Sequence, residues 1–261
     1  MHITSTEALG EVITEEVYNL LEEKCGLKRA PVPDNAQGDE PETFIFKSAD
    51  LMTNEDKLMV LIHGSGVVRA GQWARRLIIN DCLESGTQIP YIKRALSEGY
   101  AVLVMNTNDN YRTYKNGERR IRGSESPEAH ATYVWNHYVR NTKAKHIAIV
   151  AHSYGGCVTT DLFRRFQRDF QSRVFAVAMT DSVHYISYPK EFRNLIKISR
   201  NWVRSKFPLD TELETVGYDV EQVSSGELKD CHLCVSSPRG TPPTSVVSPR
   251  VLAALSQFTR T

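Results

Sequence analysis

The chain has 261 residues, a length that suits one domain with a sizeable core better than several domains. Hydrophobic residues make up 41% of it and charged residues 24%, and 32 Lys and Arg against 31 Asp and Glu leave a net charge of +1. These values are ordinary for a soluble globular protein. They exclude a collagenous or wholly disordered chain, and a strongly basic nucleic-acid surface is not the default.

The sequence predicts neither a membrane span nor a secretory signal. Its longest apolar run covers residues 58–62, whereas a transmembrane helix requires roughly 20 residues. The amino terminus has no basic stretch followed by an apolar core. The five cysteines are odd in number and mostly scattered, which favours reduced thiols in the nucleus or cytosol over a disulfide framework.

The first predicted element is an amphipathic helix within residues 1–29. Thr4 and Glu7 have capping-box spacing, apolar residues follow at helical intervals, and Gly26 marks the predicted end. Residues 30–42 predict a polar linker that contains prolines, and a short strand is expected at 43–46.

Apolar strands then alternate with amphipathic helices. Strands are predicted at 58–62, 100–105, 146–150 and 174–179, and helices at 89–98, from 127 onward and within 158–170. Strands that are apolar along their whole length are typical of a parallel sheet covered on both faces. The predicted class is therefore α/β, with a doubly wound, mostly parallel sheet whose site lies at the carboxyl ends of the strands.

The chain is expected to divide into three parts. They are an N-terminal helix over 1–29, an α/β domain over 43–222 and an irregular tail rich in Ser and Pro over 223–261. Within the domain, residues 106–127 are predicted as a long polar loop. Its tyrosines and arginines between 111 and 122 interleave in a way that suits contact with single-stranded RNA. Because loops of this length are often functional, the loop is also a candidate partner surface.

The segment 151–155, Ala-His-Ser-Tyr-Gly, follows a predicted strand and precedes a predicted helix. It differs from the G-x-S-x-G pattern only at the first glycine. Small residues on both sides of the serine let the strand and helix approach, so that Ser153 sits at the apex of a sharp turn with its hydroxyl exposed. This geometry predicts a nucleophile. The alternative is an ordinary turn in which the serine caps the helix.

The segment 63–66, His-Gly-Ser-Gly, follows the first central strand. In serine hydrolases a backbone N–H from such a turn and one from the residue after the nucleophile stabilise an oxyanion. The predicted oxyanion residues are His63, Gly64, Ser65 and Tyr154. A dinucleotide-binding turn is the alternative, but Arg69 stands where its third glycine is required.

A serine hydrolase also needs an acid and a histidine further along the chain. Asp181, at the end of a predicted strand, is the candidate acid, and a turn or capping aspartate is the alternative. The downstream histidines are His184, three residues from Asp181, and His232, which lies in the tail. Of these His232 is kept as a weak candidate. Without a base Ser153 is a poor nucleophile, so impaired catalysis is expected.

The tail contains a C-x-x-C pair, Cys231 and Cys234. A zinc site needs a second pair of ligands at suitable spacing, and a redox site would open a helix. Since neither condition is met, the two residues are interpreted as free thiols, and no metal or cofactor is predicted.

Three segments together, 58–66, 102–108 and 149–156, resemble the Arb-type domain. This α/β-hydrolase-like family is named for argonaute binding and includes animal cotranscriptional regulators and the C-terminal domains of fungal histone deacetylases. The resemblance runs from about residue 5 to about residue 220. It maps the family's serine to Ser153 and its oxyanion-type turn to His63 and Gly64.

The resemblance implies a nuclear or cytoplasmic protein with argonaute and chromatin-associated partners, acting in small-RNA-guided silencing, heterochromatin or splicing. The family continues into a last strand and helix with a His-Glu segment, which has no counterpart after about residue 222. We therefore expect a sheet that lacks them. The leading hypothesis is a non-catalytic binding module, a pseudoenzyme. The alternatives are an active serine hydrolase for esters or amides, and a truncated non-functional family member.

Overall fold

The computed structural model describes residues 5–186, 190–215 and 219–226. The strands within these ranges are β1 (Lys28–Val32), β2 (Thr43–Lys47), β3 (Lys57–Ile62), β4 (Tyr100–Val104), β5 (Tyr111–Tyr114), β6 (Gly117–Arg120), β7 (His146–His152), β8 (Val174–Thr180), β9 (Ser199–Val203) and β10 (Glu221–Ser224). The helices are α1 (Ser5–Glu23), α2 (Arg75–Asn80), α3 (Leu83–Gly86), α4 (Ile89–Ser97), α5 (Pro127–His137), the short 3₁₀ turn η1 (Val139–Asn141), α6 (Gly155–Arg165), α7 (Gln167–Arg173) and α8 (Arg193–Lys197).

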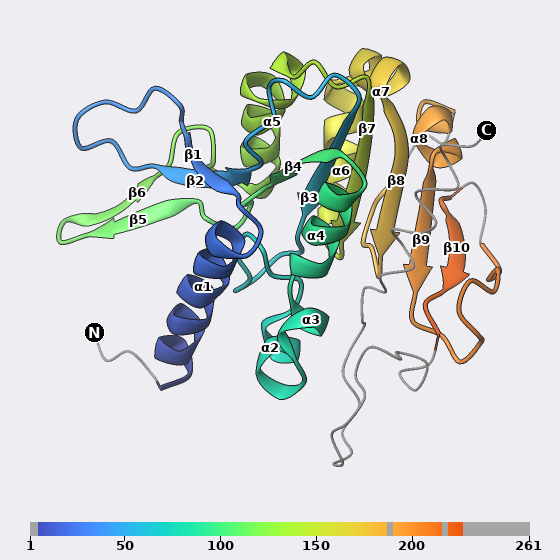
Figure 1. Cartoon of the computed structure of the whole chain (residues 1–261), viewed down its shortest axis with the longest axis horizontal. Coiled ribbons are helices and arrows are strands. Elements are labelled where there is room, and N and C mark those ends of the chain that lie inside the picture. Colours follow the sequence, from blue (N-terminus) through green and yellow to red (C-terminus); the bar gives the residue numbers. More distant parts are fainter. Residues whose placement is uncertain (1–4, 187–189, 216–218, 227–261) are drawn as a thin grey trace.

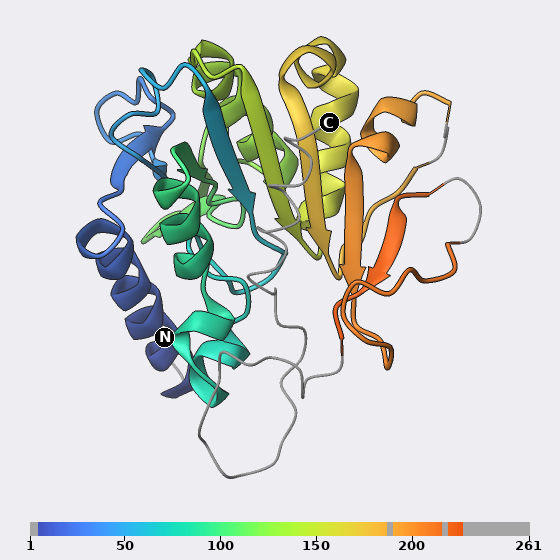
Figure 2. The same cartoon turned by 45° about the vertical axis from the view of Figure 1, so that its right-hand side comes forward.

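A mostly parallel sheet runs through the centre of the molecule (Figure 1). In the described residues it has eight strands in the order β1-β2-β4-β3-β7-β8-β9-β10, with antiparallel pairing only at β1, β2 and β4. Helices α5 to α8 cover one face, while α1 and α4 cover the other (Figure 2). The α/β class and the mostly parallel sheet are therefore confirmed.

Strand β3 shows why its sequence is apolar throughout. Leu58 and Val60 are buried in the core beneath α5 and α6, and Met59 and Leu61 are buried in the core beneath α1 and α4. Successive side chains of a strand point to opposite faces, so a strand between two helical layers needs apolar residues at every position.

Helix α1 ends close to the predicted glycine. Gly26 has φ of 66°, in the left-handed region that glycine favours, and the Leu27 N–H returns to the Leu21 carbonyl at 3.0 Å. The chain then enters β1, which starts in the last residues of the predicted helical segment and runs into the predicted linker. Pro31 fits there because β1 is the edge strand of the sheet.

The predicted polar loop at 106–127 contains a hairpin, β5–β6, which projects from the body of the molecule (Figure 1). An Asn-Gly pair, Asn116 and Gly117, lies at its turn, where Gly117 has φ of 123°. The arginines next to it form ion pairs with the 34–42 segment: Arg119 with Asp39 at 2.8 Å and Arg122 with Glu40 at 2.7 Å. Much of the hairpin's positive charge is therefore balanced within the chain.

The sheet also extends further than expected. Strands β9 and β10 continue it beyond β8, with β10 parallel to β9 along the edge. This corrects the expectation of a sheet without its last strand, as far as the described residues go. Both strands are short and mixed in character, β10 being Glu-Gln-Val-Ser, so they lack the apolar runs that marked the central strands. The expected loss of a final helix concerns residues outside the described ranges.

Candidate active site at the turn between β7 and α6

Ser153 stands at the sharp turn that the sequence predicts. It has φ of 51°, a left-handed conformation that is uncommon for a residue with a side chain and typical of functional turns. The Ser153 N–H donates to the Thr180 carbonyl at 3.0 Å, and the Ser153 carbonyl accepts from the N–H groups of Gly156 and Val183 at 3.1 and 2.9 Å. Neighbouring backbone therefore holds this conformation in place.

Two glycines allow the close approach around the serine. A Cβ added to Gly155 would lie 2.7 Å from the Ile62 carbonyl oxygen, so only glycine fits between α6 and the end of β3. A Cβ added to Gly64 would lie 3.0 Å from the Ser153 Cβ and 3.4 Å from its Oγ. The turn after β3 is thus packed directly against the serine, as its predicted oxyanion role requires.

The His63 side chain holds this turn by a hydrogen bond to the backbone of the next residue, Gly64. It is buried, and its Nδ1 donates to the Gly64 carbonyl at 2.8 Å, while burial lowers the pKa of the imidazole to about 4. The Asn108 amide also donates to the Gly64 and Val68 carbonyls, at 2.9 and 3.1 Å. Neutral His63 and Asn108 therefore anchor the turn.

The predicted oxyanion donors are available. In the described part of the chain, neither Ser65 nor Tyr154 donates its backbone N–H to another group. The Tyr154 hydroxyl, by contrast, donates to the Glu128 carboxylate at 2.6 Å, an interaction that raises the pKa of Tyr154 to about 12. Two backbone N–H groups without an acceptor are what an oxyanion hole requires, and this role of Ser65 and Tyr154 stays a prediction.

Among the described residues, no histidine ring lies within hydrogen-bond distance of the Ser153 hydroxyl. Ser153 Oγ forms no hydrogen bond with any of these residues. The Nδ1 of the adjacent His152 hydrogen-bonds to the Thr180 carbonyl oxygen at 2.9 Å, and burial lowers the pKa of the ring. His130 accepts from the Asn106 N–H at 3.1 Å and contacts Ser124, and burial lowers its pKa to about 3. His232, the candidate base, lies outside the described residues.

Asp181 occupies the predicted position at the end of β8. Its φ is 41°, its N–H donates to the Trp202 carbonyl at 2.8 Å, and its carboxylate accepts from the Arg204 N–H at 2.9 Å. These contacts tie the end of β8 to the end of β9. They correspond to the alternative interpretation, a turn aspartate, and no described imidazole hydrogen-bonds to its carboxylate. Its catalytic role remains a prediction.

A hydrogen-bonded set that the sequence did not predict lies beside this turn. Ser182 Oγ lies 3.0 Å from His184 Nδ1, and His184 Nε2 lies 3.0 Å from Asp219 Oδ1. The His184 side chain is 4% exposed. The Ser-x-His spacing was visible in the chain, but its acid partner is 35 residues away in sequence, so only the tertiary structure reveals the set.

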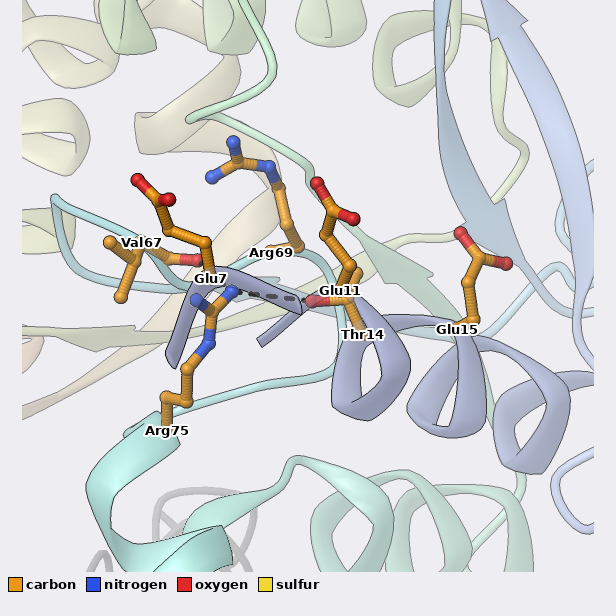
Figure 3. Close-up of a pocket in the computed structure, with 7 residues that line it drawn as sticks. All are labelled: Glu7, Glu11, Thr14, Glu15, Val67, Arg69 and Arg75. Carbon is orange, nitrogen blue, oxygen red and sulfur yellow. Dashed lines mark hydrogen bonds between the residues drawn. The ribbon is translucent and has the colours of Figure 1, made fainter. Parts of the chain in front are cut away.

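A separate pocket of about 270 Å³ lies between α1 and the segment that carries Val67 and Arg69, and Figure 3 shows the residues that line it. One wall is α1, with the carboxylates of Glu11 and Glu15, and the other carries Arg69 and Arg75. Arg75 donates to the Val67 carbonyl at 2.6 Å and to Thr14 on α1 at 3.3 Å. Arg75 therefore ties α1 to the turn that faces Ser153.

The described residues contain neither a candidate metal site nor a candidate membrane-spanning helix. No group of three or more His, Cys, Asp or Glu side chains there is placed to hold a metal ion. None of the described helices combines the length and apolar character that a membrane crossing requires.

Known proteins resemble the chain over most of its length. Cotranscriptional regulator ARB2A of Homo sapiens is 43% identical over 272 residues, covering 84% of this chain and 65% of that protein. A FAM172 family protein homolog of Caenorhabditis elegans is 47% identical over 186 residues, covering 70% and 57%. A cotranscriptional regulator ARB2A homolog of Dictyostelium discoideum is 33% identical over 242 residues, covering 79% and 62%. The chain thus spans about two thirds or less of the length of these relatives.

A solved structure of the histone deacetylase Clr3 matches with a TM-score of 0.45 and 15% identity, covering 76% of this chain and 31% of that one. The model of the Arb2 domain family matches residues 5–209, which include β3, the Ser153 turn and β8. The predicted resemblance to the Arb-type family is confirmed. With this match and relatives that are at least 33% identical over most of the chain, the chain belongs to the Arb2 domain family.

Proposed function

We propose that this chain is a regulatory module of cotranscriptional gene control that binds other proteins and does not hydrolyse a substrate at Ser153. The similarity to proteins named cotranscriptional regulators, at 43% identity over 84% of the chain, supports the regulatory role. The observation that carries the non-hydrolytic part is the Ser153 hydroxyl, which has no imidazole partner among the described residues. A serine without a general base is a weak nucleophile.

The proposed partners are argonaute and chromatin-associated proteins in the nucleus, where cotranscriptional control takes place. The family resemblance supports this choice. RNA contact through the 111–122 segment stays a secondary prediction, because Asp39 and Glu40 already pair with Arg119 and Arg122.

A direct binding measurement tests this proposal. The purified full chain is immobilised and titrated with purified argonaute, and the Ser153→Ala variant is measured beside it. Saturable binding with the same affinity for both proteins is expected, because a binding module does not use the serine hydroxyl. Failure of folded protein to bind argonaute would contradict the partner assignment, and loss of binding in Ser153→Ala would contradict a role independent of Ser153.

The second candidate is a serine hydrolase that uses Ser153. The left-handed turn, the contact with Gly64 and the available N–H groups of Ser65 and Tyr154 favour it. These features match the requirements of a nucleophile and an oxyanion hole.

A fluorophosphonate adduct on Ser153 distinguishes the two functions. The leading proposal expects no adduct on Ser153, because an unactivated hydroxyl does not displace fluoride from phosphorus at a useful rate. The adduct is located by tryptic digestion and mass spectrometry. A modified Ser153 in the peptide 146–164 would establish the hydrolase and overturn the leading proposal.

A further inference from the structure

Ser182, His184 and Asp219 form a hydrogen-bonded chain beside the Ser153 turn. The serine oxygen lies 3.0 Å from one ring nitrogen of His184, and an Asp219 carboxylate oxygen lies 3.0 Å from the other. A nucleophile within hydrogen-bond reach of a base, with the base oriented by a third group, is the arrangement that activates serine in hydrolases.

The surrounding backbone holds this set in position. The Ser182 N–H donates to the Asn201 side chain at 3.1 Å, and the Val183 N–H donates to the Ser153 carbonyl at 2.9 Å. On the other side, the Cys157 thiol lies 3.2 Å from the Val183 carbonyl. The segment between β8 and His184 is therefore fastened to β9 and to α6, and the serine and imidazole keep their mutual geometry.

Gly156 allows Ser182 to lie close to the start of α6. A Cβ added to Gly156 would clash with Ser182 Oγ, so the hydroxyl rests against the first turn of this helix. The positive end of a helix dipole favours negative charge that develops nearby. An oxyanion formed next to Ser182 would lie close to that end of α6.

The exposure of the three side chains suits their roles. Ser182 is partly exposed. The His184 side chain is 4% exposed and that of Asp219 is 36% exposed. A shielded imidazole with a carboxylate on one nitrogen and a serine hydroxyl on the other has the order of groups that a serine–base–acid set requires.

We propose that Ser182 is a second nucleophile of this chain, with His184 as its general base and Asp219 as the residue that positions the base. As Ser182 Oγ bonds to the carbonyl carbon of an ester, its proton passes to His184 Nδ1. The bond from carbon to the alcohol oxygen then breaks, and His184 returns the proton to the departing alcohol. Water hydrolyses the acyl-serine by the reverse use of His184.

The expected substrates are esters with an apolar acyl or aryl group that approach from solvent. Val183 and Tyr185 flank the site and are 57% and 77% exposed. They are exposed apolar side chains adjacent in sequence to Ser182 and His184, and an apolar acyl or aryl group would rest on them. This activity goes beyond the binding function proposed above and uses a different serine.

Site mapping with a fluorophosphonate tests the proposal on the intact chain. Attack by Ser182 forms an O–P bond, expels fluoride and releases the serine proton through His184. Trypsin separates the two serines, because Ser153 lies in the peptide 146–164 and Ser182 in the peptide 174–190. The adduct is expected on Ser182 in the unmodified protein and in Ser153→Ala, and it is expected to be lost in Ser182→Ala.

Variants of His184 and Asp219 show whether Ser182 is labelled because its hydroxyl is activated or only because it is exposed. His184→Gln is expected to slow labelling by roughly 100-fold, the scale of general-base catalysis. Asp219→Asn is expected to slow labelling by roughly 10-fold or more, with partial recovery in Asp219→Glu, because only a carboxylate orients the imidazole and stabilises its charged form. The matched control is His146→Gln, which removes an imidazole 2.9 Å from Asp56 with no serine attached; its labelling rate should not change.

Three results would overturn the proposal: no adduct on Ser182 of folded protein, an adduct on Ser153 alone, or the same labelling rate in His184→Gln. Circular dichroism confirms folding of each variant. Should Ser182→Ala fail to fold, adduct mapping in the unmodified protein and the Asp219→Asn and Asp219→Glu pair still decide the question. Argonaute binding is measured separately, so failure here leaves the proposed function untouched.

Discussion

Acidification from pH 6.5 to about pH 5 is expected to lower the free energy of unfolding by roughly 3 kcal/mol, through His63 and His130 together. Burial lowers the pKa of His63 to about 4 and that of His130 to about 3, from 6.5 in the unfolded chain. Below pH 6.5 the unfolded state therefore binds protons that the folded state does not. The stabilisation that depends on neutral His63 and His130 is complete above pH 6.5 and decreases as the pH falls below this value. It stops decreasing once the pH is below the two folded-state pKa values.

Urea unfolding at pH 7, 6 and 5 measures the slope of the free energy of unfolding against pH. The His130→Gln variant shows how much of that slope comes from His130. A glutamine oxygen can accept from the Asn106 N–H, which now donates to His130 at 3.1 Å, but the amide does not titrate. The variant should lose about half of the part that His63 and His130 supply, while His152, whose pKa burial also lowers, keeps its own contribution. An unchanged slope in a folded variant would show that His130 does not resist protonation in the native protein.

Replacement of Trp135 by alanine is expected to destabilise the protein by about 3–5 kcal/mol. Trp135, on α5, is fully buried and stacks on Phe170 of α7 and on Phe166, with ring centroids 5.1 and 5.9 Å apart. Its Nε1 also donates to the Asp169 carboxylate at 3.0 Å. Alanine removes the ring that joins α5 to α7 and leaves a cavity that its rigid neighbours fill only in part.

The control is Trp135→Phe, which keeps an aromatic ring at this position. It should cost about 1–2 kcal/mol, for the smaller ring and the lost hydrogen bond, and Asp169 keeps its ion pair with Arg140 at 3.2 Å. Urea titrations followed by circular dichroism give both values. A loss below 1 kcal/mol for Trp135→Ala would show that the layer of α5 and α7 is not tightly packed.

The Ser153 turn was predictable because its signal is local. An apolar strand, small residues around a serine and an amphipathic helix stand next to one another in the chain, and the steric demand of a sharp strand-to-helix turn acts over the same few residues. The position of Gly64 followed from a second rule, that neighbouring parallel strands end at one edge of the sheet.

Other features were not predicted from the sequence because their sequence signals were weak or non-local. The β5–β6 hairpin had a local signal, Asn116-Gly117, but its strands are polar and mostly exposed. Among the described strands β10 lies at the sheet edge, where one row of neighbours is missing and polar residues are tolerated, and β9 beside it has a mixed sequence. The aspartate that bonds His184 comes from beyond β9, and pairing of this kind leaves no periodic trace in sequence.

By itself the sequence determined the class of fold and the central strands, because burial between two helical layers demands apolar residues at every strand position. It also determined the conformation of the Ser153 turn, since few residue combinations fit so sharp a bend. Only the tertiary structure decided which polar groups meet, such as His184 with Asp219 and Asp181 with the Arg204 N–H. A hydrogen bond depends on distance in space, and side chains far apart in the chain meet only once the sheet has assembled.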